Sequence, residues 1–164
     1  MILLNTKARR NSCFMTMIRN TDILNGNAKH GDHCQNHLRS VINIAQEKNF
    51  ENKIKSYLKS IGAYFIKTHG DRFSKVGTPD IIACVNGKFV ALEVKATTGK
   101  PSELQLYHLK QITSSGGFGA IIVPTEGVER IEKYILENYP SYEYVNVIDL
   151  EKFKKVVETL LTSH

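Results

Sequence analysis

The stretch GTPDIIACVNGKFVALEVK, residues 77–95, decides the fold. It contains two apolar runs, 80–85 and 88–95, that are separated by Asn86-Gly87. An Asn-Gly pair between two such runs is a strong signal for a two-residue β-hairpin, because a type I′ turn requires positive φ at both central positions. The sequence therefore predicts a hairpin over these residues.

The length of the turn fixes the pairing of the two strands. With a two-residue turn Val85 faces Lys88, and counting outward from that pair places Asp80 opposite Glu93. Glu93 and Lys95 share a face because side chains alternate along a strand. We therefore expect Asp80, Glu93 and Lys95 to converge at the open end of the hairpin.

This convergence has an electrostatic cost. Like charges that face each other across a sheet are destabilising, and two carboxylates about 5 Å apart repel by about 3 kcal/mol at an effective dielectric constant of about 20. A divalent cation would remove the conflict, and oxygen ligands of this kind suit Mg²⁺. The alternative interpretation is a solvated Asp80 at the start of a strand, with Glu93 and Lys95 as an ordinary surface pair.

The rest of the chain supplies the other elements. Apolar residues at helical spacing from Phe50 to Ile61 predict a helix that ends at Gly62. The other expected elements are a strand at 63–67, a loop at 68–79, a helix at 101–115, a strand at 119–123, a helix at 126–138, a short strand near 144–148 and a helix from about 151 to 162. This order predicts an α/β fold with a mixed sheet and added C-terminal helices.

Charge is distributed unevenly along the chain. Residues 1–48 hold seven Lys or Arg and three Asp or Glu, a net charge of +4, whereas residues 49–164 hold fifteen and thirteen, a net charge of +2. We interpret residues 1–48 as a flexible, basic, polar extension. Residues 49–164 form the folded domain, with a core at about 49–125 and a helical addition at 126–164. The basic extension favours an anionic partner.

Several classes of protein are excluded. The three cysteines, an odd number without framework spacing, argue against a disulfide scaffold, and the short apolar runs argue against a membrane span. No apolar run of secretory type begins the chain, so we expect a cytoplasmic protein. Four residues of metal-ligand type lie close together, but no second cluster completes a zinc site, so a polar loop is favoured there. These four are His30, His33, Cys34 and His37.

The motif GTPD at 77–80, followed by EVK at 93–95, resembles the signature of the PD-(D/E)XK nucleases. Within that superfamily the stretch 51–123 is most similar to the VRR-NUC domain. The resemblance implies a restriction-endonuclease-like core and a DNA endonuclease of bacterial or phage origin that uses Mg²⁺ or Mn²⁺. It also implies branched DNA such as a Holliday junction as substrate, a homodimer as a possible assembly and no organic cofactor.

The resemblance also implies roles for individual residues. Asp80, Glu93 and the backbone carbonyl of Val94 would hold the metal, and Lys95 would orient or activate the attacking water and stabilise charge on the phosphate.

Two further residues match positions that the family uses. Glu51 would reach toward the metal from the first helix, or would only interact with the helix dipole. Gln105 falls within the apolar stripe of the helix at 101–115, where a buried polar group requires a partner. It would act in the site, or would complete a capping box with Ser102.

The loop before Asp80 is basic, and its cations are expected to contact DNA unless they form only a solvated surface. These residues are Lys67, His69, Arg72 and Lys75. Two alternatives remain open at this stage: a restriction-type or RNA-directed nuclease on the same fold, and a catalytically inactive DNA-binding module.

Overall fold

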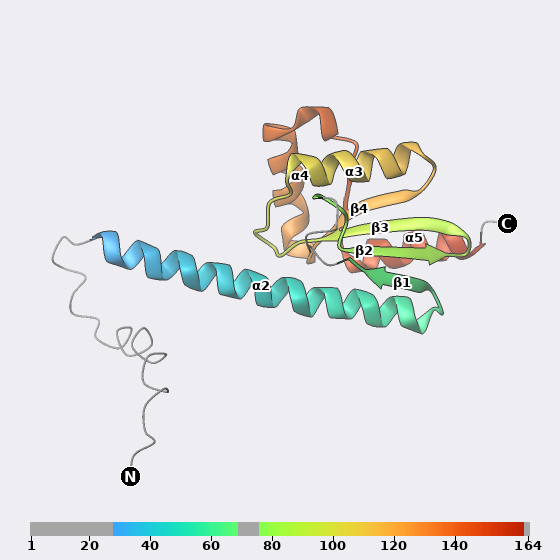
Figure 1. Ribbon diagram of the computed structural model, residues 1–164, viewed down its shortest axis with the longest axis horizontal. Coiled ribbons are helices and arrows are strands. Elements are labelled where there is room, and N and C mark those ends of the chain that lie inside the picture. Colours follow the sequence, from blue (N-terminus) through green and yellow to red (C-terminus); the bar gives the residue numbers. More distant parts are fainter. Residues whose placement is uncertain (1–27, 69–75, 163–164) are drawn as a thin grey trace, which may run out of the picture. The chain divides into compact units, whose positions relative to one another are not determined.

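The computed structural model describes residues 28–68 and 76–162, with side chains from residue 36 onward. Helices and strands alternate along most of this part of the chain (Figure 1). The elements are α2 (Ala28–Ser60), β1 (Tyr64–Lys67), β2 (Ile81–Val85), β3 (Lys88–Val94), α3 (Glu103–Ser114), β4 (Phe118–Ile122), η2 (Thr125–Gly127), α4 (Val128–Asn138), η3 (Pro140–Tyr142), β5 (Asn146–Ile148) and α5 (Leu150–Thr162). The predicted α/β class is confirmed.

The five strands form one sheet in the order β1-β2-β3-β4-β5. The pairs β1–β2 and β2–β3 are antiparallel, whereas β3–β4 and β4–β5 are parallel, so the predicted mixed sheet is confirmed. β3 therefore lies at the centre, where the antiparallel half meets the parallel half. This strand ends within the EVK motif, at Val94.

The sheet has an apolar cluster on each face. One cluster joins alternate strand residues to α2 and α5, through residues such as Ile54 and Phe153. The other joins the intervening strand residues to α3 and α4, through residues such as Leu106 and Ile131. The protein is thus a three-layer arrangement of helix, sheet and helix, and α3 covers the face to which Ala91 and Glu93 point (Figure 1).

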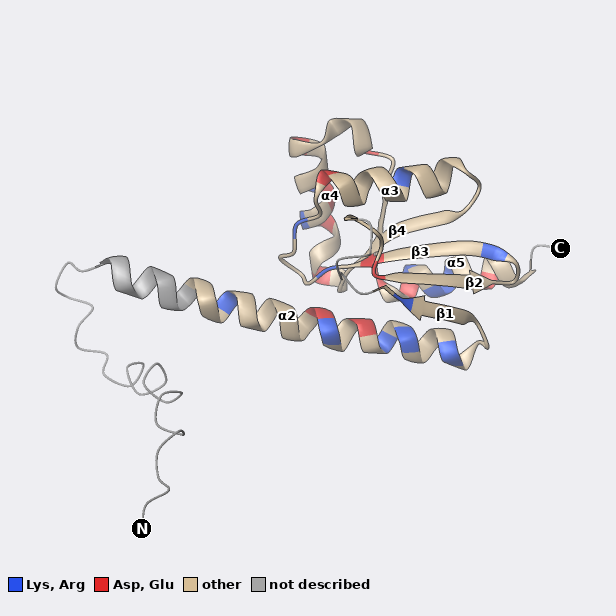
Figure 2. Ribbon diagram, viewed as in Figure 1, with Lys and Arg blue, Asp and Glu red and all other residues tan. Residues whose placement is uncertain are grey.

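The helix predicted from Phe50 to Ile61 is present, but α2 already begins at Ala28. The chain separates by its internal contacts into two units, Met1–Ile42 and Asn43–His164, and the second unit contains the whole sheet. Two glutamates and four lysines lie along the part of α2 that belongs to this second unit, and only lysines follow Glu51 among its charged residues (Figure 2). No helix among residues 28–68 and 76–162 is long and apolar enough to cross a lipid bilayer.

Candidate active site

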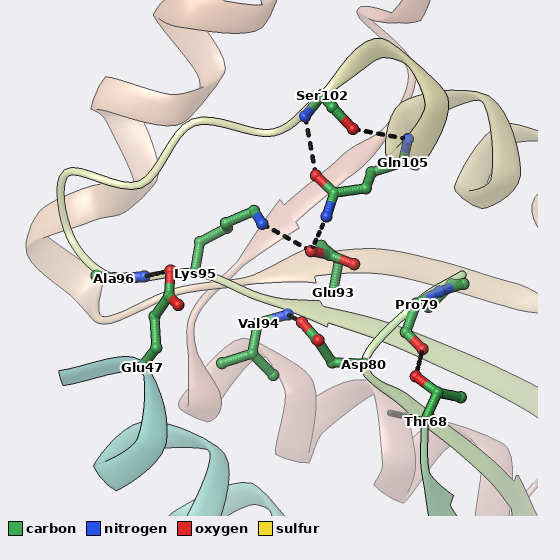
Figure 3. Close-up of polar contacts among 10 residues, drawn as sticks. All are labelled: Glu47, Thr68, Pro79, Asp80, Glu93, Val94, Lys95, Ala96, Ser102 and Gln105. Atoms are coloured by element: carbon green, nitrogen blue, oxygen red, sulfur yellow. Dashed lines mark hydrogen bonds and ion pairs between the residues drawn. The ribbon is translucent and has the colours of Figure 1, made fainter. Parts of the chain in front are cut away.

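The hairpin has the predicted turn and register. Asn86 and Gly87 have φ values of 48° and 78°, and Ile81 pairs with Leu92 at the open end. Asp80 directly precedes the paired residues of β2, and its Oδ2 accepts a hydrogen bond of 2.9 Å from the main-chain N–H of Val94 (Figure 3). This contact ties the carboxylate of Asp80 to the backbone that joins Glu93 to Lys95.

Glu93 lies at the centre of the group and is 1% exposed. Its Oε1 accepts hydrogen bonds from Lys95 Nζ at 2.7 Å and from Gln105 Nε2. Its Oε2 is the one buried side-chain nitrogen or oxygen without a hydrogen-bond partner in the part of the chain that the structure describes. Because an unpaired buried polar atom is costly, this oxygen marks a place where a further partner would be stabilising.

The protonation of Glu93 reflects the same surroundings. Burial raises the pKa of Glu93 to about 7, the charge of Lys95 opposes this shift, and the neighbouring charge of Asp80 adds to it. The expected conflict between the two carboxylates is therefore present, and Lys95 relieves only a part of it.

Gln105 combines the two roles that the sequence left open. Its backbone N–H donates to Ser102 Oγ, and its side-chain Oε1 accepts from the main-chain N–H of Ser102 at 2.8 Å, so the capping box is complete. At the same time its Nε2 donates to Glu93 (Figure 3). The side chain of Gln105 therefore takes part both in the N-terminal cap of α3 and in the group formed by Asp80 and Glu93.

The donor set fits a hard cation. Among the described residues no group of three or more His, Cys, Asp or Glu side chains could hold a metal ion. Mg²⁺ is usually bound by one or two carboxylates and completes its shell with water or phosphate oxygens. The pair Asp80 and Glu93, with one buried oxygen that has no partner among the described residues, meets this smaller requirement.

Glu51 has different partners from those expected. It is 7% exposed, and its two carboxylate oxygens bind Lys55 and Lys67, each at 2.6 Å. Burial acts to raise the pKa of Glu51, but the hydrogen bonds from the two lysines outweigh it and the pKa is lowered. The carboxylate is thus ionised and engaged with lysines rather than with Asp80 or Glu93, and its role at the metal stays a prediction.

The same ion pair involves the first of the four expected DNA contacts. Lys67 is bound to Glu51, although its side chain is still 35% exposed. His69, Arg72 and Lys75 lie outside the described residues. The side chains of His30, His33 and Cys34 lie outside them too.

Sequence reasoning missed Glu47. Its Oε1 accepts a hydrogen bond of 3.1 Å from the main-chain N–H of Ala96, directly after Lys95 (Figure 3). Four residues before Glu47, the side chain of Asn43 accepts a hydrogen bond of 2.9 Å from Thr98 Oγ1. These hydrogen bonds hold the segment that follows the EVK motif against α2. The only signal in the sequence is the spacing of four residues between Glu47 and Glu51, which places both on one helix face.

Comparisons with known proteins identified no relative. No protein-family model matches the chain, and the searches of curated proteins and of solved structures gave no match either.

Proposed function

We propose that the protein is a nuclease that uses Mg²⁺ or Mn²⁺ to hydrolyse phosphodiester bonds in DNA. One observation carries the proposal: Glu93 is buried beside Asp80, its Oε1 is bound by Lys95 and Gln105, and its Oε2 has no partner among the described residues. A carboxylate group arranged in this way is costly as a structural element but useful as a ligand for a cation.

The architecture supports the same proposal. A helix, an antiparallel hairpin extended by a third strand, a second helix and a parallel strand follow one another, as the resemblance to a restriction-endonuclease-like core implies. The site lies where β3 ends, at the junction of the antiparallel and parallel halves of the sheet. Fold alone does not define chemistry, so the proposal depends on the side chains at that junction.

Asp80 and Glu93, with the carbonyl oxygen of Val94, would hold the cation. Bound there, the metal supplies Lewis acidity at a phosphate oxygen and makes hydroxide available near neutral pH. The protein contributes a rigid donor set, because the Val94 N–H holds Asp80 while Lys95 and Gln105 hold Glu93.

Lys95 has the second role. Its ammonium group lies 2.7 Å from Glu93 Oε1 and its side chain is 14% exposed, so it is fixed at the edge of the group and accessible from one side. An ammonium carries three donors, and those not used by Glu93 can orient the attacking water or stabilise charge that develops on the phosphate.

The expected substrate is branched or structured DNA. The resemblance to the VRR-NUC domain favours a junction or flap, and the net charge of +6 is compatible with a polyanion. A restriction-type or RNA-directed nuclease is a second possibility on the same site, and an inactive DNA-binding module is a third.

One experiment separates these functions. The purified protein is incubated with duplex, flapped, single-stranded and four-way-junction DNA and with RNA, in Mg²⁺, Mn²⁺ or EDTA. We expect cleavage of branched DNA that requires the metal and that is lost in Asp80→Asn and in Lys95→Ala. Lys133→Ala, which removes an exposed lysine on α4, is the matched control and should cleave as the wild type does.

The possible results have distinct meanings. Cleavage in EDTA at the rate seen in Mg²⁺ would exclude the metal mechanism. Metal-dependent cleavage of RNA alone would reassign the substrate, and binding of DNA without cleavage under any condition would indicate the inactive module.

A further inference from the structure

The amide of Gln105 has two ends, and the structure determines which end faces which partner. Its Oε1 lies 2.8 Å from the main-chain nitrogen of Ser102, which can only donate a hydrogen bond. The atom that faces Ser102 must therefore be the oxygen of the amide. The Nε2 group is consequently turned toward Glu93, where it donates to Oε1.

This orientation affects the two oxygens of Glu93 differently. With Lys95 and Gln105 both donating to Oε1, that oxygen has two hydrogen bonds, whereas Oε2 has no partner among the described residues. If the amide were reversed, its oxygen would face the carboxylate and repel it. The capping box of α3 thus decides whether Gln105 supports or opposes the ionised form of Glu93.

We propose that Ser102, through its main-chain N–H, is a positioning residue that turns Gln105 into a donor and so reserves Glu93 Oε2 for the divalent cation. This inference rests on the proposed function, because it assigns a ligand to that oxygen. Ser102 itself is exposed, and its main-chain N–H and its hydroxyl both hydrogen bond with Gln105. It acts through Gln105.

Two substitutions at one position isolate the N–H. Ser102→Ala removes the Oγ that caps the N–H of Gln105 but keeps the main-chain N–H that faces Oε1. Ser102→Pro removes both groups, and the backbone accommodates it because φ at Ser102 is −83°, near the value of about −65° that proline imposes. The comparison of the two variants therefore reports on the main-chain donor, while both lose the hydroxyl cap.

The readouts are the Kd for Mn²⁺, measured by calorimetry without DNA, and kcat and KM on the cleaved DNA. In Ser102→Pro we expect at least about a tenfold loss of Mn²⁺ affinity and of kcat relative to Ser102→Ala, as is typical when a group that orients a metal ligand is removed. KM should stay unchanged, because the role proposed for Ser102 is to position a metal ligand and not to bind DNA. Equal Mn²⁺ affinity and equal kcat in the two variants would overturn the inference.

A second variant keeps the test decisive if Ser102→Pro does not fold. Gln105→Glu retains an acceptor for the Ser102 N–H, as in a capping box with glutamate, but presents an oxygen to Glu93. We expect at least about a tenfold lower kcat, whereas Gln111→Glu, which adds the same charge at an exposed position of α3, should match the wild type. Wild-type kcat in Gln105→Glu would overturn the inference.

The failure of the inference and the failure of the proposed function can be told apart. If the wild-type protein neither binds Mn²⁺ nor cleaves any nucleic acid, the proposed function is wrong and the inference falls with it. If the wild type binds Mn²⁺ and cleaves while the Ser102 variants do not differ, only the role of Ser102 is wrong.

Discussion

Glu93 is subject to opposite demands as a buried group and as a ligand. Burial favours its neutral form and raises its pKa to about 7, whereas the proposed function requires the charged form. The charge and the hydrogen bond of Lys95 oppose this rise in the pKa without abolishing it. A group of this kind links metal binding to the uptake and release of a proton near neutral pH.

The stability of the metal-free protein should depend on this group. The folded pKa of about 7 lies above the ordinary value of 4.5, so the folded state binds more protons than the unfolded state between these values. The contribution of Glu93 to the free energy of unfolding is therefore fully present below about pH 4.5. It is lost as pH rises through 7, by an amount on the order of 3 kcal/mol. Denaturant unfolding in EDTA across this pH range measures the loss.

Substitution of the carboxylate tests the assignment of that loss. Glu93→Gln removes the titrating group and should flatten the pH dependence, whereas Glu132→Gln, at an exposed position of α4, should leave it unchanged. If the two variants show the same slope, the pH dependence does not come from Glu93.

At the scale of elements, Gly77 is the point at which the loop before Asp80 packs against α3. It has a φ of 84°, and a Cβ added there would lie 2.7 Å from Leu104 Cγ and 3.1 Å from the backbone of the same residue. The close approach places the loop that carries Asp80 against the helix that carries Gln105. A side chain at this position would force the two apart.

Gly77→Ala should therefore destabilise the fold more than a substitution at a comparable glycine. Gly62 also has a positive φ, 70°, but nothing lies within 4 Å of an added Cβ, so Gly62→Ala has only the backbone cost of about 1–2 kcal/mol. We expect Gly77→Ala to lose about 1–3 kcal/mol more, which denaturant unfolding of both variants measures. Equal losses would mean that the loop and α3 are not in contact.

The elements differ in how far the sequence determines them. The hairpin and its register followed from Asn86-Gly87, because the turn geometry is local and fixes the pairing of Asp80 with the EVK motif. The start of α2 could not be predicted in this way. Its first half contains Leu38, Val41 and Ile42, which are more than 40% exposed, so the helix is not marked by a buried apolar face.

Contacts between distant segments were the least predictable part of the site. Lys67 binds Glu51 from sixteen residues away, and Glu47 binds a main-chain N–H forty-nine residues further on. Neither pairing leaves a local pattern, because each depends on where α2 lies against the sheet. The capping box at Ser102 was visible because both partners lie within one turn.

At the scale of the whole molecule, residues 43–164 hold the sheet, both apolar clusters and the candidate site. A protein that begins at Asn43 keeps the contacts of Asn43 and Glu47 with the segment after Lys95. It loses six Lys or Arg and two Asp or Glu, a net charge of +4.

This truncated protein should fold with nearly unchanged Tm and bind Mn²⁺ as the full chain does. Its affinity for DNA should fall and depend less on salt. Each lost phosphate contact makes the negative slope of log K against log salt shallower by about 0.9. Thermal unfolding and DNA titrations at several salt concentrations test both parts. An insoluble product, or an unchanged salt slope, would show that the first 42 residues have a different role.

The order of the strands has a consequence for how the chain is made. Neighbours in the sheet are also neighbours along the sequence from β1 to β5, so each strand can add to an existing edge in the order in which it leaves the ribosome. The β2–β3 hairpin is complete once Val94 has left the ribosome, before Glu103, the first residue of α3, has left it. Asp80 and Glu93 can therefore meet in the nascent chain before Gln105 leaves the ribosome. At that stage the helix that covers Glu93 is still missing, so the burial that raises the pKa of Glu93 arises only when α3 docks.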